Sequence, residues 1–141
     1  MKVVLDTNVL VSAVLVATSP PARILQAWRA GVFQLVVSGD LLLELRDVLN
    51  RPRIAERSGW SAEDVATLIG ALMASAAFVE PGDVLHVVSD DDDNRVLEAA
   101  LAGEADYIVS GDRALLSLGR YEGIEIVTPA RLWAILSSQE P

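Results

Sequence analysis

Apolar and polar positions follow two different periods along the chain. Short apolar runs that end in polar residues are typical of buried strands in parallel sheets. Such runs predict strands at residues 2–6, 33–38, 78–81, 106–112 and 124–128. A further extended run, at residues 85–89, leads directly into four consecutive aspartates.

Longer stretches carry apolar residues at helical spacing. Ser38 and Ser61 stand where an N-cap is expected, and Pro129 stands at the start of the last such stretch. The spacing predicts helices at residues 22–31, 38–50, 61–76, 94–103, 113–120 and from 129 onward. Residues 9–16 are apolar almost all round, which fits either a buried helix or a second strand.

The alternation of strands and helices predicts an α/β fold. A length of 141 residues suits one domain with a single well-filled core, and no repeat or low-complexity linker divides the chain. The pattern favours a mostly parallel central sheet with helices on both faces. Ligands bind such sheets at the carboxyl ends of the strands, so the polar residues that end strands are the candidates for chemistry.

Composition narrows the class of protein. No apolar run approaches the roughly 20 residues of a membrane span, and we expect a cytoplasmic protein. The chain has no Cys, so disulfides and thiolate metal sites are excluded. A net charge of −9 argues against a broadly basic surface that coats nucleic acid. Arg46, Arg51, Arg53 and Arg57 nevertheless lie close in sequence, as a charged helix face or as a rim that contacts phosphates.

Carboxylates follow several of the predicted strands. Asp6 ends the first strand, Asp90–Asp93 follow the run at 85–89, and Asp112 ends the strand at 106–112. Thr7, Asn8, Ser38 and Ser110 place hydroxyl and amide groups beside strand ends. Because parallel strands end at one edge of the sheet, we expect these acids to converge there.

Glu44 is the remaining candidate acid. It lies about 8–9 Å along the predicted helix from its start, and helical side chains lean toward the N-terminus, so its carboxylate can reach the same edge. The surrounding leucines make an unpaired charge expensive at this position. A partner is therefore expected, either an arginine, a hydroxyl or a metal ion.

Clustered carboxylates with few cations suit a hard divalent ion such as Mg²⁺ or Mn²⁺. Such an ion polarises phosphoryl oxygens and activates water, which is the chemistry of phosphodiester hydrolysis. Simpler interpretations exist for each acid. Asp6, Asp93 and Asp112 can each cap the helix that follows, and the aspartate run can be a solvated loop. Glu44 can pair with a nearby arginine such as Arg46.

Three sequence blocks together resemble the PIN domain family. They are MKVVLDTNVLVSA (1–13), SGDLLLELRDVLNRPR (38–53) and DDDDNRVLEAALAGEADYIVSGD (90–112), and they occur in the family's order. The resemblance covers residues 1–133, which we take as a PIN-like nuclease domain, with 134–141 as a C-terminal tail. It implies a three-layer α/β/α sandwich. Within the family the chain is most similar to VapC-like ribonuclease toxins of prokaryotic toxin–antitoxin pairs.

The resemblance implies a Mg²⁺- or Mn²⁺-dependent endoribonuclease. The implied catalytic metal ligands are Asp6, Glu44, Asp93 and Asp112. Asn8, Ser38 and Ser110 would support these ligands, Asp90 and Asp92 are possible additional acids, and Arg46, Arg51 and Arg53 are candidates for RNA binding. The register also allows Asn94 in place of Asp93. The family implies a homodimer and, for toxins, an antitoxin that covers the site.

Other functions remain open on the sequence alone. A non-catalytic PIN-fold module that binds RNA or protein would share the fold. A phosphatase with Asp6 as nucleophile is disfavoured because no second Asp follows two residues on. A dinucleotide-binding domain is disfavoured because no G-x-G-x-x-G follows the first strand. His86, which lies outside the acidic blocks, is expected to be structural.

Overall fold

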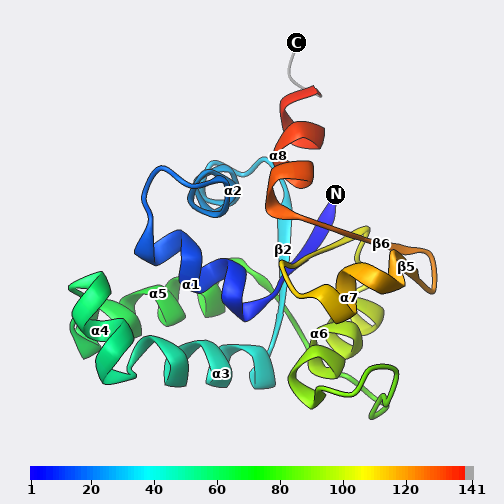
Figure 1. The fold of residues 1–141 in the computed structure, drawn as a ribbon, viewed down its shortest axis with the longest axis horizontal. Helices are drawn as coiled ribbons and strands as arrows, with labels where there is room; N and C mark the ends of the chain where they lie inside the picture. Colours follow the sequence, from blue (N-terminus) through cyan, green and yellow to red (C-terminus); the bar gives the residue numbers. More distant parts are fainter. Residues whose placement is uncertain (139–141) are drawn as a thin grey trace.

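The computed structural model describes residues 1–138 and contains one six-stranded sheet (Figure 1). The strand order is β3-β2-β1-β4-β6-β5. The strands are β1 (Lys2–Leu5), β2 (Gln34–Ser38), β3 (Ala77–Val79), β4 (Tyr107–Val109), β5 (Arg120–Tyr121) and β6 (Ile124–Val127). All neighbouring pairs are parallel except β5 and β6. The sheet is therefore mostly parallel, as predicted.

Eight helices connect or follow the strands in residues 1–138. They are α1 (Thr7–Leu15), α2 (Pro20–Arg29), α3 (Gly39–Leu49), α4 (Pro52–Ser58), α5 (Ala62–Ser75), α6 (Asp91–Ala102), α7 (Arg113–Leu118) and α8 (Pro129–Ser138). The predicted caps explain two helix starts. The Ser38 hydroxyl accepts from the amide of Leu41, and Ser61 and Asp64 form a reciprocal capping box at α5.

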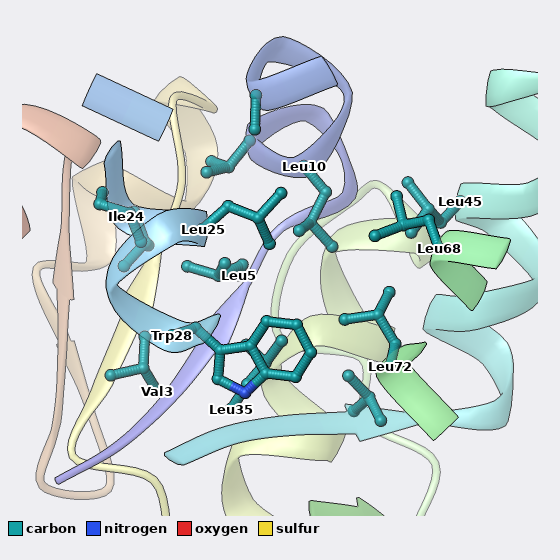
Figure 2. Close-up of a cluster of buried hydrophobic side chains, with 14 of the residues drawn as sticks. Val3, Leu5, Leu10, Ile24, Leu25, Trp28, Leu35, Leu45, Leu68 and Leu72 are labelled. Atoms are coloured by element: carbon teal, nitrogen blue, oxygen red, sulfur yellow. The ribbon is translucent and has the colours of Figure 1, made fainter. Parts of the chain in front are cut away.

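Successive residues of the central strands face opposite layers of helices. Val3 and Leu5 of β1 belong to a core shared with helices α1, α2, α3, α5 and α8, whereas Val4 belongs to a second core, shared mainly with α6 and α7. Figure 2 shows the larger core, where Leu35 of the sheet meets Trp28 and Leu72 from helices. Apolar side chains fill both faces of the sheet, which makes a three-layer α/β/α arrangement and confirms the predicted fold class.

One contact between the layers is unusually close. Gly103 ends α6 directly over β2, and a Cβ atom built on Gly103 would lie 2.6 Å from Cγ1 of Val36. Real Cβ atoms do not approach other heavy atoms so closely. The absence of a side chain at position 103 therefore lets the end of α6 rest on the sheet.

Several elements differ from the predictions. Residues 9–15 belong to helix α1 and Val16 is its C-cap, which decides for the helix, and α6 begins at Asp91 because the aspartates themselves form its first turn. The run at 85–89 was expected to be extended and strand-like, but it joins no strand of the sheet. Its backbone amides are bonded instead by side chains of α6, as described below. Helix α4 and strand β5 were not predicted.

The C-terminal helix extends into the expected tail. Helix α8 continues through Ser138 and buries Leu136 in the larger core, so residues 134–138 are helical. Residues 139–141 of the expected tail lie outside the described residues. In the described part of the chain no single helix is long and apolar enough to cross a membrane. Only α1 and α2 together pass such a test, and they are bent by 98° where they join.

Candidate functional site

Asp6 and Ser110 lie side by side at the carboxyl edge of the sheet. Asp6 follows β1, Ser110 follows the neighbouring strand β4, and the amide of Asp6 donates to the carbonyl of Val109. The Ser110 hydroxyl donates to Oδ2 of Asp6 at 2.7 Å, and both residues are buried. Burial raises the pKa of Asp6, which the Ser110 hydroxyl and the nearby amide of Asn8 partly offset.

Asp112 joins this pair through Ser110. The backbone amide of Asp112 donates to the Ser110 hydroxyl at 2.9 Å. Oδ1 of Asp112 accepts from the amides of Ala114 and Leu115 and so caps helix α7. The helix-cap interpretation of Asp112 is therefore correct. The charge of Asp112 also raises the pKa of Asp6, so its carboxylate lies close to the site as well.

Asp93 faces Asp112 and Asp6 from the first turn of α6. Its side chain is 7 % exposed, and Oδ2 is buried without a hydrogen-bond partner. Burial raises the pKa of Asp93 to about 7, and the charge of Asp112, hydrogen bonding with that carboxyl, and the charges of Asp6 and Asp90 act in the same direction. The carboxyl is therefore crowded by acids and lacks a cation that would stabilise its ionised form.

The four aspartates of residues 90–93 have different environments. Asp90 is the N-cap of α6, and its Oδ1 accepts from the amide of Asp92. Asp91 and Asp92 are exposed, while Asp93 is buried. Asn94, the other candidate for the position of Asp93, is turned to the loop before α6 and bonds its backbone. Of Asp93 and Asn94, it is therefore Asp93 that faces the other carboxylates.

Glu44 reaches the same group of acids from helix α3. Its side chain is half-buried. Burial raises the pKa of Glu44, the charges of Asp92, Asp6 and Asp90 raise it further, and a hydrogen bond with the Thr7 hydroxyl lowers it. Glu44 therefore lies close enough to Asp6 and to the acids at the start of α6 for their charges to act on its carboxyl.

The other candidate residues divide into two groups. Ser38 is buried at the end of β2, but its hydroxyl caps α3, and Asn8 is exposed in the first turn of α1. Arg51 and Arg53 are exposed at helix α4, which Figure 1 shows at the far end of α3 from the sheet. Arg46 forms only a loose, exposed ion pair with Asp47 at 3.7 Å.

Within residues 1–138, no arginine or lysine forms an ion pair with the clustered acids. In residues 1–138, the ion pairs are Arg46–Asp47, Arg95–Glu98 and Arg120–Glu125. The alternative in which Glu44 pairs with a nearby arginine is therefore not observed. In the same residues, no three acidic or histidine side chains are already close enough to coordinate one ion. Carboxylate oxygens are nonetheless the donors that Mg²⁺ or Mn²⁺ prefers, and Oδ2 of Asp93 is buried without a hydrogen-bond partner.

The sequence-based prediction missed the polar side chains that hold the β3–α6 loop (residues 80–90). Glu98 accepts from the amide of Leu85 at 2.8 Å and pairs with Arg95 at 2.7 Å. Asn94 and Glu98 are both buried and four residues apart on α6. Two polar residues at helical spacing among alanines and leucines were the available signal. His86 is exposed on this loop.

Comparisons with known proteins agree with this architecture. The sequence profile of the PIN domain family matches residues 2–114. The chain is 27 % identical over 118 residues to the uncharacterized protein MJ1680 of Methanocaldococcus jannaschii. The aligned region covers 84 % of this chain and 75 % of that protein. It is also similar in fold to a chain in the crystal structure of VapBC2 from Rickettsia felis bound to a DNA fragment from their promoter. That match has a TM-score of 0.60 and 14 % identity, and covers 91 % of this chain and 98 % of the other.

Proposed function

The chain belongs to the PIN domain family, and on that premise we propose that it is a Mg²⁺- or Mn²⁺-dependent endoribonuclease. One observation carries the proposal. Asp6, Asp93 and Asp112 come from three distant parts of the chain to one sheet edge. There the charge of Asp112 raises the pKa of Asp6, the charges of Asp112 and Asp6 raise the pKa of Asp93, and none of the three forms an ion pair within residues 1–138. A purely structural cluster would be expected to contain a compensating arginine or lysine.

The residues present fit a divalent ion. Asp6, Glu44, Asp93 and Asp112 would hold it, and Asp90 and Asp92 stand close enough to add charge. Ser110 keeps Asp6 in a fixed orientation through its 2.7 Å bond, which is the kind of support that ligating carboxylates need. The same acids repel the phosphates of RNA, so a cation is also needed for the substrate to approach.

The chemistry follows from this arrangement. When bound, a divalent ion neutralises charge on the scissile phosphate and lowers the pKa of a water molecule. The chain contributes the fixed carboxylates and the exposed amide of Asn8 at the rim of the site. In-line attack of water on the phosphodiester would leave 5′-phosphate and 3′-hydroxyl ends. The lone histidine, His86, is not among the clustered side chains and is given no role in cleavage.

RNA would approach along helix α3. Arg51 lies just beyond the C-cap of α3 and is the N-cap of α4, so it stands where the chain turns from one helix to the next. Arg53 is exposed on α4, a helix that buries no residue of its own. Arg46 adds a third cation on α3. These arginines are suited to contact phosphates on one side of the scissile bond.

We further propose that the protein is the toxin of a toxin–antitoxin pair. The fold similarity to the VapBC2 structure supports this partner class. A small antitoxin protein would cover the acidic edge, and the protein would act as a homodimer in the cytoplasm. The cellular role is separate from the chemistry, because a housekeeping ribonuclease could use the same carboxylates.

An RNA cleavage assay tests the enzymatic part. Wild-type protein should cleave RNA with Mg²⁺ or Mn²⁺ and lose activity with chelator, and Asp6→Asn should abolish cleavage without loss of fold. Asp106→Asn is the matched control, since Asp106 accepts from the amide of Lys2 at the opposite edge of the sheet and an Asn can still accept that bond. Cleavage by Asp6→Asn at the wild-type rate would contradict the proposal. If wild-type protein binds no Mn²⁺, the non-catalytic binding module is favoured instead.

A further inference from the structure

The β3–α6 loop is held by side chains rather than by the sheet. Residues 80–90 form no helix or strand, although the loop leads directly into the acidic start of α6. Three residues of α6 bond its backbone, and one of them, Arg95, makes only a long contact of 3.4 Å with the carbonyl of Leu85. Asn94 holds Val87 and Val88, and Glu98, one turn later, holds Leu85. The loop therefore has a fixed path at the point where it delivers Asp90 to the helix.

Both the oxygen and the nitrogen of the Asn94 side-chain amide have hydrogen-bond partners. Its Oδ1 accepts from the amides of Val87 and Val88, both at 3.0 Å. Its Nδ2 donates to the carbonyl of Val88 at 2.8 Å and makes a longer contact of 3.5 Å with Oδ1 of Asp91. Asn94 has no solvent exposure. An ionised aspartate has the same shape but only accepts hydrogen bonds, so it would turn an oxygen toward the Val88 carbonyl.

This anchoring determines where Asp93 points. Neighbouring residues on a helix project about 100° apart, so a side chain of Asn94 fixed on the loop leaves Asp93 directed to the other side, toward Asp112 and Asp6. The backbone amide of Asn94 also donates to the carbonyl of Asp90 at 3.2 Å, which sets the first turn of α6. Asn94 thus bonds both the loop before the four-aspartate run and the first two aspartates of the run.

We propose that Asn94 is a positioning residue, which aims Asp93 and Asp90 at the metal-binding edge by locking the preceding loop onto α6. This inference rests on the proposed function, since it assigns Asn94 a role in ion binding beyond stability. Glu98 supplies the comparison. It also anchors the loop, but one turn farther from the acids, so it serves stability without aiming a ligand.

Calorimetric titration with Mn²⁺ separates these roles. Asn94→Asp adds a negative charge beside the acids, so electrostatic attraction alone predicts tighter binding of Mn²⁺. Positioning predicts the opposite, a 10–100-fold weaker affinity, which is typical when a residue that orients metal ligands is changed. Glu98→Gln should lower the melting temperature and leave the Mn²⁺ affinity unchanged. Circular dichroism confirms that each variant is folded at the titration temperature.

The outcomes distinguish this inference from the proposed function. If wild-type protein binds no Mn²⁺, both the proposed function and the role proposed for Asn94 are contradicted. If wild-type protein binds Mn²⁺ and folded Asn94→Asp binds it equally or more tightly, only the role of Asn94 is overturned. An equal loss of affinity in Glu98→Gln would also overturn it, because both anchors would then act alike.

A second measurement on the wild-type protein covers the case in which Asn94→Asp does not fold. Coupling between two sites is reciprocal, so an ion that needs the Asn94 contacts must strengthen them. Hydrogen exchange at the amides of Val87 and Val88 should slow when Mn²⁺ is added. The amide of Leu85, bonded to Glu98, is the internal control and should change less. Unchanged exchange at Val87 and Val88 would contradict the proposal.

Discussion

The Ser110 hydroxyl donates to the Asp6 carboxylate at 2.7 Å across 104 residues of sequence. The contact is possible because β1 and β4 are parallel neighbours, and both residues follow the ends of their strands. The same hydroxyl oxygen accepts from the amide of Asp112. A single buried side chain therefore connects the first strand, the fourth strand and the start of α7, and it orients two of the clustered acids.

Removal of this hydroxyl should weaken ion binding. Ser110→Ala leaves Asp6 without its donor and the Asp112 amide without its acceptor, so we expect a 10–100-fold loss of Mn²⁺ affinity and about 1–3 kcal/mol less stability toward unfolding. Ser110→Thr keeps the hydroxyl and should retain ion binding. Calorimetry and urea denaturation measure both quantities. Wild-type Mn²⁺ affinity in a folded Ser110→Ala protein would show that this contact does not position Asp6.

The stability of the metal-free protein should decrease as the pH rises from about 4 to 7. Burial, and after it the neighbouring acids Asp112, Asp6 and Asp90, raise the pKa of Asp93 from 3.8 to about 7, so the folded state holds a proton that the unfolded state has released. More protons bound in the folded state means that the free energy of unfolding falls with pH across this window, by an amount on the order of a few kcal/mol. The loss of stability is absent below the pKa that Asp93 has in the unfolded state, and it is complete above pH 7.

Urea denaturation with chelator at pH 5 and pH 8 measures this effect. Asp93→Asn cannot ionise at position 93, so its free energy of unfolding should change less between the two pH values and should exceed the wild-type value at pH 8. Mn²⁺ should stabilise wild-type protein at pH 8 more than it stabilises Asp93→Asn. Equal pH dependence in both proteins would show that Asp93 ionises normally in the folded state.

The arginines at the end of α3 should act on RNA binding rather than on cleavage. Arg51→Ala with Arg53→Ala should raise KM for RNA and leave kcat little changed. The slope of the logarithm of the binding constant against the logarithm of the salt concentration should become shallower by about one unit per lost phosphate contact. Arg120→Ala is the control, because Arg120 lies on β5 at the opposite side of the sheet and pairs with Glu125. An unchanged KM in the double variant would show that RNA does not contact α4.

Two glycine substitutions should change stability in opposite directions. Gly103→Ala forces a Cβ to within 2.6 Å of Val36 and should destabilise the protein by about 1–3 kcal/mol. Gly70→Ala lies within α5, where nothing is within 4 Å of the new Cβ, and should stabilise it by roughly 0.5–1 kcal/mol through helix propensity. Thermal denaturation compares them. A neutral Gly103→Ala would mean that α6 can move away from β2.

The fold was predictable where local patterns and the final packing agree. The helix N-cap at Ser61 and the apolar strand at residues 2–6 each have one physical solution, and both were recognised. Helix α4 was missed because its seven residues bury none of their side chains, so no periodicity identifies it. The run at 85–89 was misjudged because its amides are bonded by Asn94 and Glu98, a contact that no local pattern contains.

Part of the candidate site was also recognisable from sequence. Asp6 and Asp112 follow strands, and parallel topology brings such residues together. The choice between Asp93 and Asn94 depended on which side chain bonds the loop, a tertiary contact that spacing does not determine. The lack of a compensating cation near Glu44 was likewise undetermined, because Arg46 is close in sequence but forms its ion pair with Asp47.

Diffraction from crystals soaked in Mn²⁺ tests most directly whether the acids form an ion site. The ion has a strong anomalous signal, so its position can be determined independently of the protein density. We expect a peak at the carboxyl edge of the sheet, in direct coordination distance of Asp6 and Asp93, and no such peak in Asp6→Asn crystals. A Mn²⁺ peak elsewhere, with these carboxylates unchanged at ion concentrations that support RNA cleavage, would contradict the account.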